Sequence, residues 1–584
     1  MAWELKVLAL ILFIVIINAF ENGSNARLSR PEMSDVAGSG NIDGEGDGES
    51  EGDDDSDEGD TLQTTTVNTT HGEVRGHVRT NNIPVMSFID IPYGKYEKFQ
   101  APTVADPWAD VHEVKEHKKI CHQLNGNNLV GDADCLVLSI FKPIETKEPA
   151  SVVFHIHDGH FIEGSGDYNI YGPEYLVGQG VIVVLPNYRL GVPGFVCLQN
   201  EIAPGNAALK DLTLALTWVK NNIAAFGGDP EKITVSAEGQ AGALVGYLAL
   251  SLKSKNLFNQ VITESGAILA PWALDRNPRD KALKLIKSLS DESKDNKDSV
   301  LLEVELETIL LEARKQNILF KPCIEAGDDA FIKETPWKIM NGKDFCTNIT
   351  FMIGSANKAG IHETESHDNN SLAKLNDNYE LLIPNDLVFP GNVAAKRNAA
   401  NRIKKLYFDD KKISKETKEE LALFYTDSCY LGPNLRLARP LLKAGAVVYL
   451  YEFACDGPRN LEKLALNSII PGAARGDIIG YVFKQEEINS EEEEKEPIEE
   501  EESNNTNEEL PIAGSVLWER MNATNETLMI IGKEPALKES VHPERMNLWT
   551  ELYNNHFVET SSSVLLSANI FSVAIFSFIS FRAF

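Results

Sequence analysis

Basic residues are scarce in this sequence relative to acidic ones. Its 584 residues include 55 Lys and Arg against 87 Asp and Glu, which gives a formal net charge of -32 at pH 7. Proteins that bind a phosphate backbone or an anionic membrane surface present an excess of positive charge. The composition therefore argues against nucleic acid and anionic membrane surfaces as partners.

Two tracts that almost lack bases hold most of this charge. Residues 43–60 carry eleven acids and no base, and residues 486–509 carry thirteen Glu and one Lys. Segments so poor in apolar side chains bury too little surface to offset the entropy of ordering. We predict an acidic disordered segment at residues 20–65. We also predict a solvated Glu-rich insertion at residues 484–510, with a long exposed helix as the alternative.

Long hydrophobic runs are confined to the two ends of the chain. Residues 3–20 resemble a secretory signal, with Lys6 before the apolar stretch and Ala19 as a small residue for cleavage. We therefore predict a signal peptide at residues 1–19. The rival interpretation, a membrane anchor, needs a longer run than this one.

The second run extends from Val564 to Phe581 and follows three serines. Small residues before a terminal hydrophobic tail are typical of a GPI signal, which we place at residues 561–584. A single-pass helix is the alternative. Both interpretations put the protein in the secretory pathway and at the cell surface, and secretion into the extracellular matrix is the remaining possibility.

Cysteine is also sparse, with seven residues in the whole chain. In an oxidising compartment seven cysteines allow three disulfides with one left over. The odd one is either a buried thiol, as expected for Cys197 in its apolar stretch, or an intermolecular bridge. Seven N-x-S/T acceptors agree with a secreted glycoprotein. They are Asn22, Asn68, Asn348, Asn369, Asn504, Asn522 and Asn525.

Between these flanks the sequence alternates predicted strands and helices. The β-branched runs SVVFHIH (151–157), VIVVLPNY (181–188) and KITVSAEG (232–239) predict buried parallel strands. The stretches 206–227 and 243–254 have helical spacing of apolar residues. Later helices are predicted at 280–291 and 394–405. Such alternation predicts an α/β fold with a mostly parallel central sheet and helices on both faces.

Several long motifs resemble the type-B carboxylesterase and cholinesterase family. PNYRLGVPGF, APGNAALKD and NNIAAFGGDPEKITV occur in this order within residues 186–235, and SKNLFNQVITESG follows at 254–266. FIDIPYGKYEKFQAP (88–102) and PGAARGDIIGYVF (471–483) extend the resemblance in both directions. It implies a single α/β-hydrolase domain, here residues 66–556, with a deep gorge leading to a Ser–Glu/Asp–His triad. It also implies a disulfide between Cys121 and Cys135. Cys323–Cys346 is a tentative second pair, and Cys429–Cys455 could be a third.

The triad that the resemblance implies is missing. The nucleophile belongs on a G-x-S-x-G turn, which here reads Ala237-Glu238-Gly239-Gln240-Ala241. Gly239 therefore replaces the serine, and with both flanking glycines changed we expect a reshaped turn. The literal G-x-S-x-G around Ser50 lies in the acidic segment and is interpreted as a chance match. Ala359 replaces the acid in the segment GSANKAG, and Arg475 replaces the histidine in PGAARGD.

The oxyanion hole is also altered relative to the family pattern H-G-G-G-F. It reads His157-Asp158-Gly159-His160-Phe161, and Gln240 would supply the third amide. Asp158 would repel a developing oxyanion. A metal site built from His155, His157 and His160 is less favoured than a polar gorge, and Ser236 is expected to point into packing. We predict no metal and no cofactor.

These features predict an inactive carboxylesterase homologue with catalytic positions Gly239, Ala359 and Arg475. It resembles family members that lack catalytic activity, namely neuroligin, neurotactin, gliotactin and glutactin. The predicted function is cell adhesion or recognition of an extracellular or cell-surface protein. A protein that binds an ester or lipid in a retained gorge is the first alternative, and a residual carboxylic ester hydrolase is the second. A homodimer is left open.

Overall fold

The computed structural model describes ten stretches of the chain. They are residues 26–27, 64–81, 83–146, 149–290, 298–342, 348–485, 517–518, 520–522, 525–533 and 535–557. The predicted signal peptide and C-terminal anchor lie outside the described residues. So do most of the acidic segment and of the Glu-rich insertion. Among the described residues, none of the helices combines the length and the hydrophobicity that a membrane span requires.

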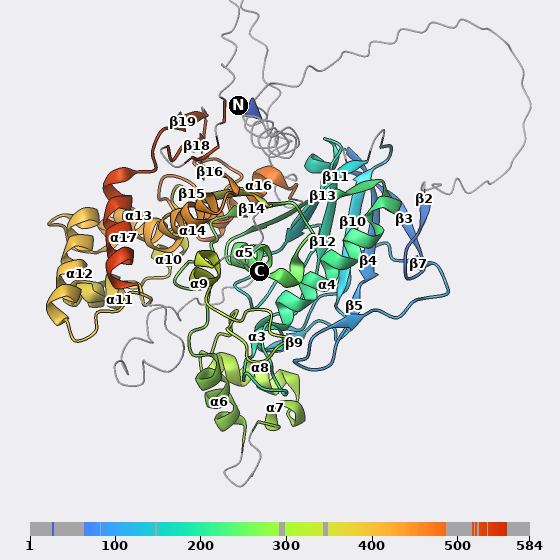
Figure 1. The fold of residues 1–584 in the computed structure, drawn as a ribbon, viewed down its shortest axis with the longest axis horizontal. Coiled ribbons are helices and arrows are strands. Elements are labelled where there is room, and N and C mark those ends of the chain that lie inside the picture. Colours follow the sequence, from blue (N-terminus) through green and yellow to red (C-terminus); the bar gives the residue numbers. More distant parts are fainter. Residues whose placement is uncertain are drawn as a thin grey trace, which may run out of the picture.

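A large mixed sheet runs through the molecule (Figure 1). Its strands follow one another in the spatial order β19-β18-β16-β15-β14-β13-β11-β12-β10-β4-β3-β2, with β7 beside β3. The seven central strands from β18 to β12 pair in parallel. The strands toward both edges pair antiparallel, except that β7 lies parallel to β3. The strands are β2 (Thr64–Asn68), β3 (Glu73–Asn81), β4 (Ile83–Pro92), β7 (His112–Glu113), β10 (Val137–Pro143), β11 (Ala150–Ile156), β12 (Ile182–Pro186), β13 (Gly228–Glu238), β14 (Gln260–Glu264), β15 (Thr350–Ala356), β16 (Val447–Phe453), β18 (Leu528–Ile531) and β19 (Ala536–Lys538).

Helices cover both faces of this sheet, as predicted. From β11 the chain steps to β12 on one side and then returns past β11 to β13 on the other. Because such crossovers are right-handed, this reversal puts α2 on the face opposite to α4 and α5. The helices nearest the sheet and the site are α2 (Glu174–Val177), α3 (Gly191–Phe195), α4 (Ala207–Asn222), α5 (Ala241–Leu250), α9 (Pro336–Asn341), α10 (Ile361–Glu365), α14 (Gly432–Lys443) and α16 (Ile479–Val482).

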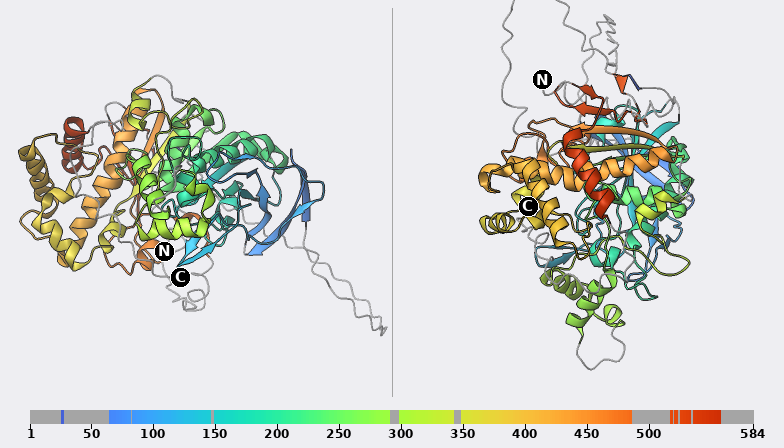
Figure 2. Two further views of the ribbon diagram at one scale, coloured as in Figure 1. Left: turned by 90° about the horizontal axis from the view of Figure 1, so that it is seen from below. Right: turned by 60° about the vertical axis from the view of Figure 1, so that its left-hand side comes forward.

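Apart from the short α15 (Leu461–Ala465), the remaining α-helices form two outer groups (Figure 2). One group lies below the sheet in Figure 1, and it contains α6 (Pro278–Leu289), α7 (Val300–Glu303) and α8 (Leu306–Lys315). The other flanks the β19 side and contains α11 (Asn369–Asp377), α12 (Val393–Phe408), α13 (Lys418–Thr426) and α17 (Pro543–His556). The helices predicted at 280–291 and 394–405 are therefore α6 and α12.

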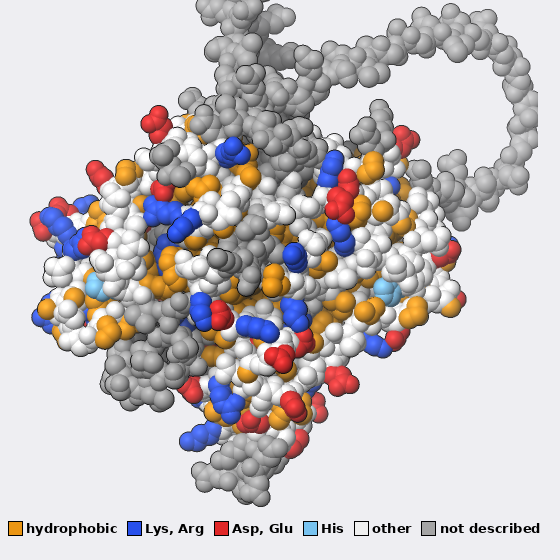
Figure 3. All heavy atoms as spheres, in the orientation of Figure 1, with side chains coloured by type: hydrophobic (Ala, Val, Ile, Leu, Met, Phe, Trp, Pro, Cys, Tyr) orange, Lys and Arg blue, Asp and Glu red, His pale blue; other side chains and the backbone are white. Residues whose placement is uncertain are grey.

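The hydrophobic core explains why the central strands are almost unbroken apolar runs. In β12 every residue from Ile182 to Pro186 is buried, because helices pack on both faces. Helix α5 is buried over its whole length between the sheet and the surrounding helices. On the outer surface shown in Figure 3, acidic and basic side chains are interspersed.

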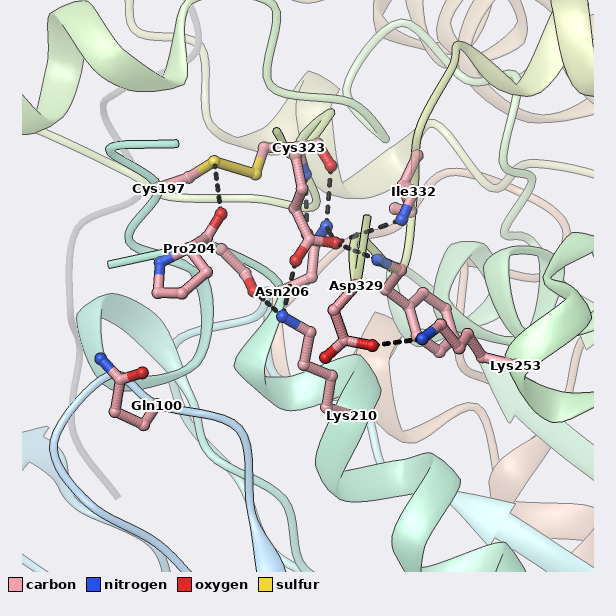
Figure 4. Close-up of polar contacts among 12 residues, drawn as sticks. Gln100, Cys197, Pro204, Asn206, Lys210, Lys253, Cys323, Asp329 and Ile332 are labelled. Carbon is pink, nitrogen blue, oxygen red and sulfur yellow. Dashed lines mark hydrogen bonds and ion pairs between the residues drawn. A yellow bond between two sulfur atoms is a disulfide. The ribbon is translucent and has the colours of Figure 1, made fainter. Parts of the chain in front are cut away.

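Two disulfides join described cysteines, and one of them differs from the prediction. Cys121–Cys135 forms as the resemblance implied. Cys323, however, bonds to Cys197 across 126 residues of sequence (Figure 4), so the tentative Cys323–Cys346 pair is wrong. Cys197 is correspondingly not the free thiol. Cys346 lies outside the described residues.

The other two described cysteines do not form the suggested third pair. Cys429 and Cys455 are both buried free thiols. Burial raises the pKa of Cys429 and raises that of Cys455 to about 11. Both are therefore protonated and unreactive at neutral pH.

Candidate functional site

The candidate site lies where the chain reverses direction across the sheet. Strands β11 and β13 are parallel neighbours, with His155 opposite Ser236 and Ile156 opposite Ala237. The loops that follow their carboxyl ends must therefore lie side by side. Ligands of open α/β sheets bind at such switch points. Here the two loops are the altered oxyanion segment and the turn at Gly239.

The turn at Gly239 keeps strand–turn–helix geometry, contrary to the reshaping that we expected. Gly239 directly follows β13, has φ +57° and precedes α5 by two residues. Its N–H donates to the Glu264 carbonyl at 2.8 Å. The backbone of Gly266 packs closely against the turn, since a Cβ on Gly266 would lie 1.9 Å from the Gly239 carbonyl oxygen. The flanking alanines are accommodated without loss of the turn.

A carboxylate occupies the space where a nucleophile side chain would begin. A Cβ built on Gly239 would lie 2.0 Å from Asp158 Oδ2. Asp158 Oδ1 accepts a hydrogen bond from the Ala241 N–H at 3.1 Å, at the start of α5. Burial raises the pKa of Asp158, and the Arg475 charge and the Gly159 and Ala241 amides oppose this rise. No side chain fits at position 239 while Asp158 stays there.

The rest of the oxyanion segment is held in left-handed backbone conformations. Gly159 has φ +134°, and a Cβ on it would lie 1.8 Å from the Glu163 carbonyl oxygen. His160 and Phe161 follow with φ +56° and +66°, a conformation that costs energy for residues with a Cβ. Gln240 is the N-cap residue of α5, and its side chain makes no capping hydrogen bond.

The base position is a buried arginine. Arg475 is 4% exposed, and its Nη2 lies 3.0 Å from His160 Nε2. Burial acts to lower the pKa of Arg475, but Tyr430, Asp158, Glu462 and Glu363 outweigh burial and raise it. Burial of His160, together with the charges of Arg475 and His362, lowers the pKa of His160 well below its usual value. Neutral His160 therefore accepts the arginine N–H.

The acid position carries no functional group. Ala359 is fully buried just after β15, and its N–H donates to the Ala356 carbonyl. Glu363, four residues later, is oriented by a hydrogen bond from the Tyr430 hydroxyl. Burial raises the pKa of Glu363 despite the nearby Arg475 charge. The three positions thus converge on one acidic, arginine-centred cluster, and two of them, Gly239 and Ala359, carry no polar side chain.

Sequence reasoning missed several members of this cluster. Glu462 contributes a carboxyl whose pKa burial raises to about 7, and its Oε1 lies 3.7 Å from His362 Nε2. The His362 ring lies 5.1 Å from the His160 ring, centroid to centroid. Burial raises the pKa of Glu264, beside the turn, to about 8. Only the position of Glu363, close after the acid position, offered a signal in the sequence.

A second polar relay lies beneath the turn. Ser236 Oγ is 2.9 Å from His155 Nδ1, and His155 Nε2 is 3.0 Å from Glu238 Oε2. The Tyr171 hydroxyl donates to Glu238 Oε1 at 2.8 Å. Burial pushes the pKa of Glu238 upward, but His155 and Tyr171 outweigh burial and lower it. Ser236 is 3% exposed and points into packing as expected, so substrates cannot reach this serine–histidine–glutamate series.

Other predicted features are distributed over the surface. Asn68, Asn348, Asn369 and Asn522 are exposed and Asn525 is half-buried, while Asn22 and Asn504 lie outside the described residues. Within the described part of the chain, no three His, Cys, Asp or Glu side chains are grouped so that they could hold a metal ion.

Comparisons with known proteins show that this chain is similar in sequence to several esterases. Esterase E4 of Myzus persicae is 30% identical over 453 residues, which cover 71% of this chain and 80% of that protein. A juvenile hormone esterase of Tribolium castaneum is 28% identical over 66% of this chain and 72% of its own length. These relatives are named as esterases, so the comparisons favour the hydrolase alternative over adhesion.

A solved structure of low sequence identity has the same fold. The crystal structure of juvenile hormone esterase from Manduca sexta, with OTFP covalently attached, superposes with a TM-score of 0.71 at 22% identity. It covers 84% of this chain and 100% of that one. The predicted α/β-hydrolase fold is therefore confirmed. The sequence profile of the Carboxylesterase family matches residues 63–549, and the chain belongs to that family.

Proposed function

We propose that this carboxylesterase-family protein does not hydrolyse esters through the family triad and acts by binding. The observation that carries the proposal is the Asp158 carboxylate, whose Oδ2 lies 2.0 Å from the place of a Cβ on Gly239. Covalent ester hydrolysis needs a nucleophile on this turn and a base that can take its proton. Gly239 has no side chain, and Arg475 stays protonated at every accessible pH.

Ester hydrolysis is the competing proposal, and the names of the relatives support it. A hydrolase here would need a nucleophile from outside the family positions. The Ser236–His155–Glu238 series has suitable chemistry, but its serine is 3% exposed. It also lies on β13 before the turn, away from the α5 amides. For these reasons we place hydrolysis second.

The proposed partner is an extracellular or cell-surface protein, in an adhesion or recognition role. The predicted signal peptide, the exposed acceptor asparagines and the predicted anchor support a place at the cell surface. Binding of an ester or lipid in a retained gorge is the remaining alternative. Homodimer formation stays a prediction.

An activity-based probe tests the catalytic part of the proposal. The glycosylated full-length protein is treated with a fluorophosphonate probe and assayed with p-nitrophenyl acetate, next to an active juvenile hormone esterase. We expect no stoichiometric labelling, because no accessible activated serine exists at the turn. Stoichiometric labelling, mapped to one serine, would overturn the proposal and favour hydrolysis.

The binding part needs a separate assay. Cells that express the full chain are compared with untransfected cells for aggregation and for capture of surface proteins after crosslinking. Aggregation supports adhesion. Retention of a hydrophobic ligand by the purified protein, without aggregation, favours the small-molecule alternative.

A further inference from the structure

An apolar pocket opens between the loop that follows β14, helix α9 and the residue that follows α17. It encloses about 340 Å³ of space between the atoms, part of it open to solvent, which is near the lower limit for small-molecule sites. None of the described residues that line it is a triad position or belongs to the oxyanion segment, so the pocket is separate from the turn at Gly239. Its walls are mainly apolar and include Ile268, Leu269, Leu274, Trp337 and Phe557, together with one charged residue, Arg276.

Two arginines share a single carboxylate beside this pocket. Arg276 Nη2 and Arg436 Nη1 lie 4.0 and 3.9 Å from the same atom, Asp386 Oδ2. The other oxygen of Asp386 accepts a hydrogen bond from the Tyr553 hydroxyl at 3.0 Å. Asp275, which precedes Arg276 in the chain, pairs instead with a lysine at 2.9 Å. Two guanidinium charges therefore face one carboxylate, and this group carries an excess of positive charge.

The shared carboxylate does not satisfy either arginine. Arg276 Nε, Arg436 Nη1 and Asp386 Oδ2 are buried, and none of the three has a hydrogen-bond partner among the described residues. Arg436 is 8% exposed, and its guanidinium lies 3.7 Å from the Tyr553 ring and 4.6 Å from the Phe557 ring. Buried charged groups are normally hydrogen-bonded, because an unsatisfied charged donor costs free energy. Arg276, which lines the pocket and has a side chain 22% exposed, therefore has donors left for a further acceptor.

The walls and the charge together define a class of ligand. A guanidinium binds a carboxylate through two parallel hydrogen bonds, and apolar walls favour a hydrocarbon chain. A cation is repelled by the two arginines, whereas a neutral apolar ligand leaves the buried donors unsatisfied. An anion with an apolar body satisfies both parts of the pocket.

We infer that this pocket binds a small amphipathic monocarboxylate, such as a medium-chain fatty acid. Its carboxylate contacts Arg276, and its chain lies against Leu274 and Trp337. Arg436 adds positive charge from its place against the Phe557 ring, which is itself part of the pocket wall. The inference goes beyond the proposed function, because the pocket shares no residue with the triad positions and can be filled whether or not the protein hydrolyses esters.

Equilibrium dialysis of the full-length protein against radiolabelled octanoate tests the inference. We expect one saturable site per chain with a Kd of about 1 mM or tighter, an affinity within reach of roughly ten ligand heavy atoms. Arg276→Gln keeps a polar side chain without the charge. It should raise the Kd about 10-fold or more, because a charge-assisted hydrogen bond is lost.

Three controls separate the charged head from the apolar chain and from general effects of charge. Octanamide, which has the same chain and a neutral head, should bind about 10-fold more weakly than octanoate. Acetate, which has the head without the chain, should also bind at least about 10-fold more weakly, because each buried methylene adds affinity. Arg75→Gln removes an arginine that pairs with Glu113 near the β2 edge of the sheet, and it should leave octanoate binding unchanged.

Any of three results would overturn the inference. They are the absence of saturable octanoate binding up to about 10 mM, equal binding of octanamide, and unchanged octanoate binding by folded Arg276→Gln. If Arg276→Gln does not fold, Leu274→Glu replaces it, because it sets a fixed carboxylate on the pocket wall and should abolish octanoate binding. Unchanged binding by that variant rejects the inference equally. The outcome is independent of fluorophosphonate labelling, which reports on an activated serine.

Discussion

Two buried polar clusters of this protein are built in opposite ways. The first cluster surrounds Glu325 and lies beside the Cys197–Cys323 disulfide (Figure 4). Both carboxylate oxygens of Glu325 accept hydrogen bonds. Glu325 Oε1 accepts from Lys210 Nζ at 2.6 Å, and Oε2 accepts from Asn206 Nδ2 at 2.7 Å and from two backbone N–H groups. This is how buried charges are normally stabilised.

The cluster around Arg475 lacks such pairing. Its guanidinium makes one described hydrogen bond, to a neutral histidine, and Glu363 Oε2 has no hydrogen-bond partner among the described residues. Several carboxyl groups there have raised pKa values, including Glu462 at about 7 and Glu264 at about 8. Unsatisfied buried groups gather at sites that serve, or once served, a purpose other than stability.

The largest expected effect comes from breaking the well-paired cluster. Glu325→Ala leaves Lys210, Asn206 and two backbone N–H groups without their shared acceptor. We expect a loss of about 3–5 kcal/mol in the free energy of unfolding, measured by urea denaturation. A loss below about 1 kcal/mol would mean that this cluster is no better stabilised than the one around Arg475.

Restoration of the triad tests what prevents ester hydrolysis at the cluster around Arg475. Gly239→Ser, Ala359→Glu and Arg475→His together should give only a trace rate of p-nitrophenyl acetate hydrolysis, because Asp158 still occupies the space beside position 239. Adding Asp158→Gly should raise kcat/KM by roughly 10²-fold, the usual contribution of one intact oxyanion donor. Equal activities of the triple and quadruple variants would show that Asp158 moves aside freely.

The raised carboxyl pKa values predict a pH dependence of stability. Glu264 binds a proton up to about pH 8 in the folded state, whereas its usual pKa is 4.5. The folded state therefore binds more protons than the unfolded state between these values, and the free energy of unfolding falls as pH rises through that window. Glu264→Gln should reduce this fall by on the order of 1–3 kcal/mol between pH 5 and pH 8.

The measurement is the free energy of unfolding from urea titrations at several pH values. Glu305→Gln, which changes an exposed glutamate, is the matched control and should leave the slope unchanged. An unchanged slope in Glu264→Gln would assign the pH dependence to other carboxyl groups with raised pKa values, such as Glu462 at about 7 or Asp477, whose pKa burial raises to about 6.

The smallest effect is expected at the rim of the Glu325 cluster. Asp329 pairs with Lys253 (Figure 4), but its side chain is 90% exposed. Exposed ion pairs contribute about 0–1 kcal/mol, so Asp329→Ala should change the free energy of unfolding by less than about 0.5 kcal/mol. A loss as large as that of Glu325→Ala would mean that burial does not explain the difference between the two residues.

Much of the fold was predictable because its signals are local. The runs at 151–157, 181–188 and 232–239 became β11, β12 and β13, since buried parallel strands require β-branched apolar residues. The Cys121–Cys135 disulfide, whose cysteines are 14 positions apart in the sequence, followed from the family pattern. The turn at Gly239 kept its geometry because the backbone conformation depends on glycine there and not on the flanking alanines.

The sequence by itself determined the identity of the residues at the three triad positions, because long gapless motifs fix them in register. Only the tertiary structure decided what those residues contact. It brought Cys197 to Cys323 across 126 residues, and it set Asp158 against Gly239 through the pairing of β11 with β13. Contacts of this kind depend on which loops meet at the edge of the sheet, and no local pattern in the sequence records them.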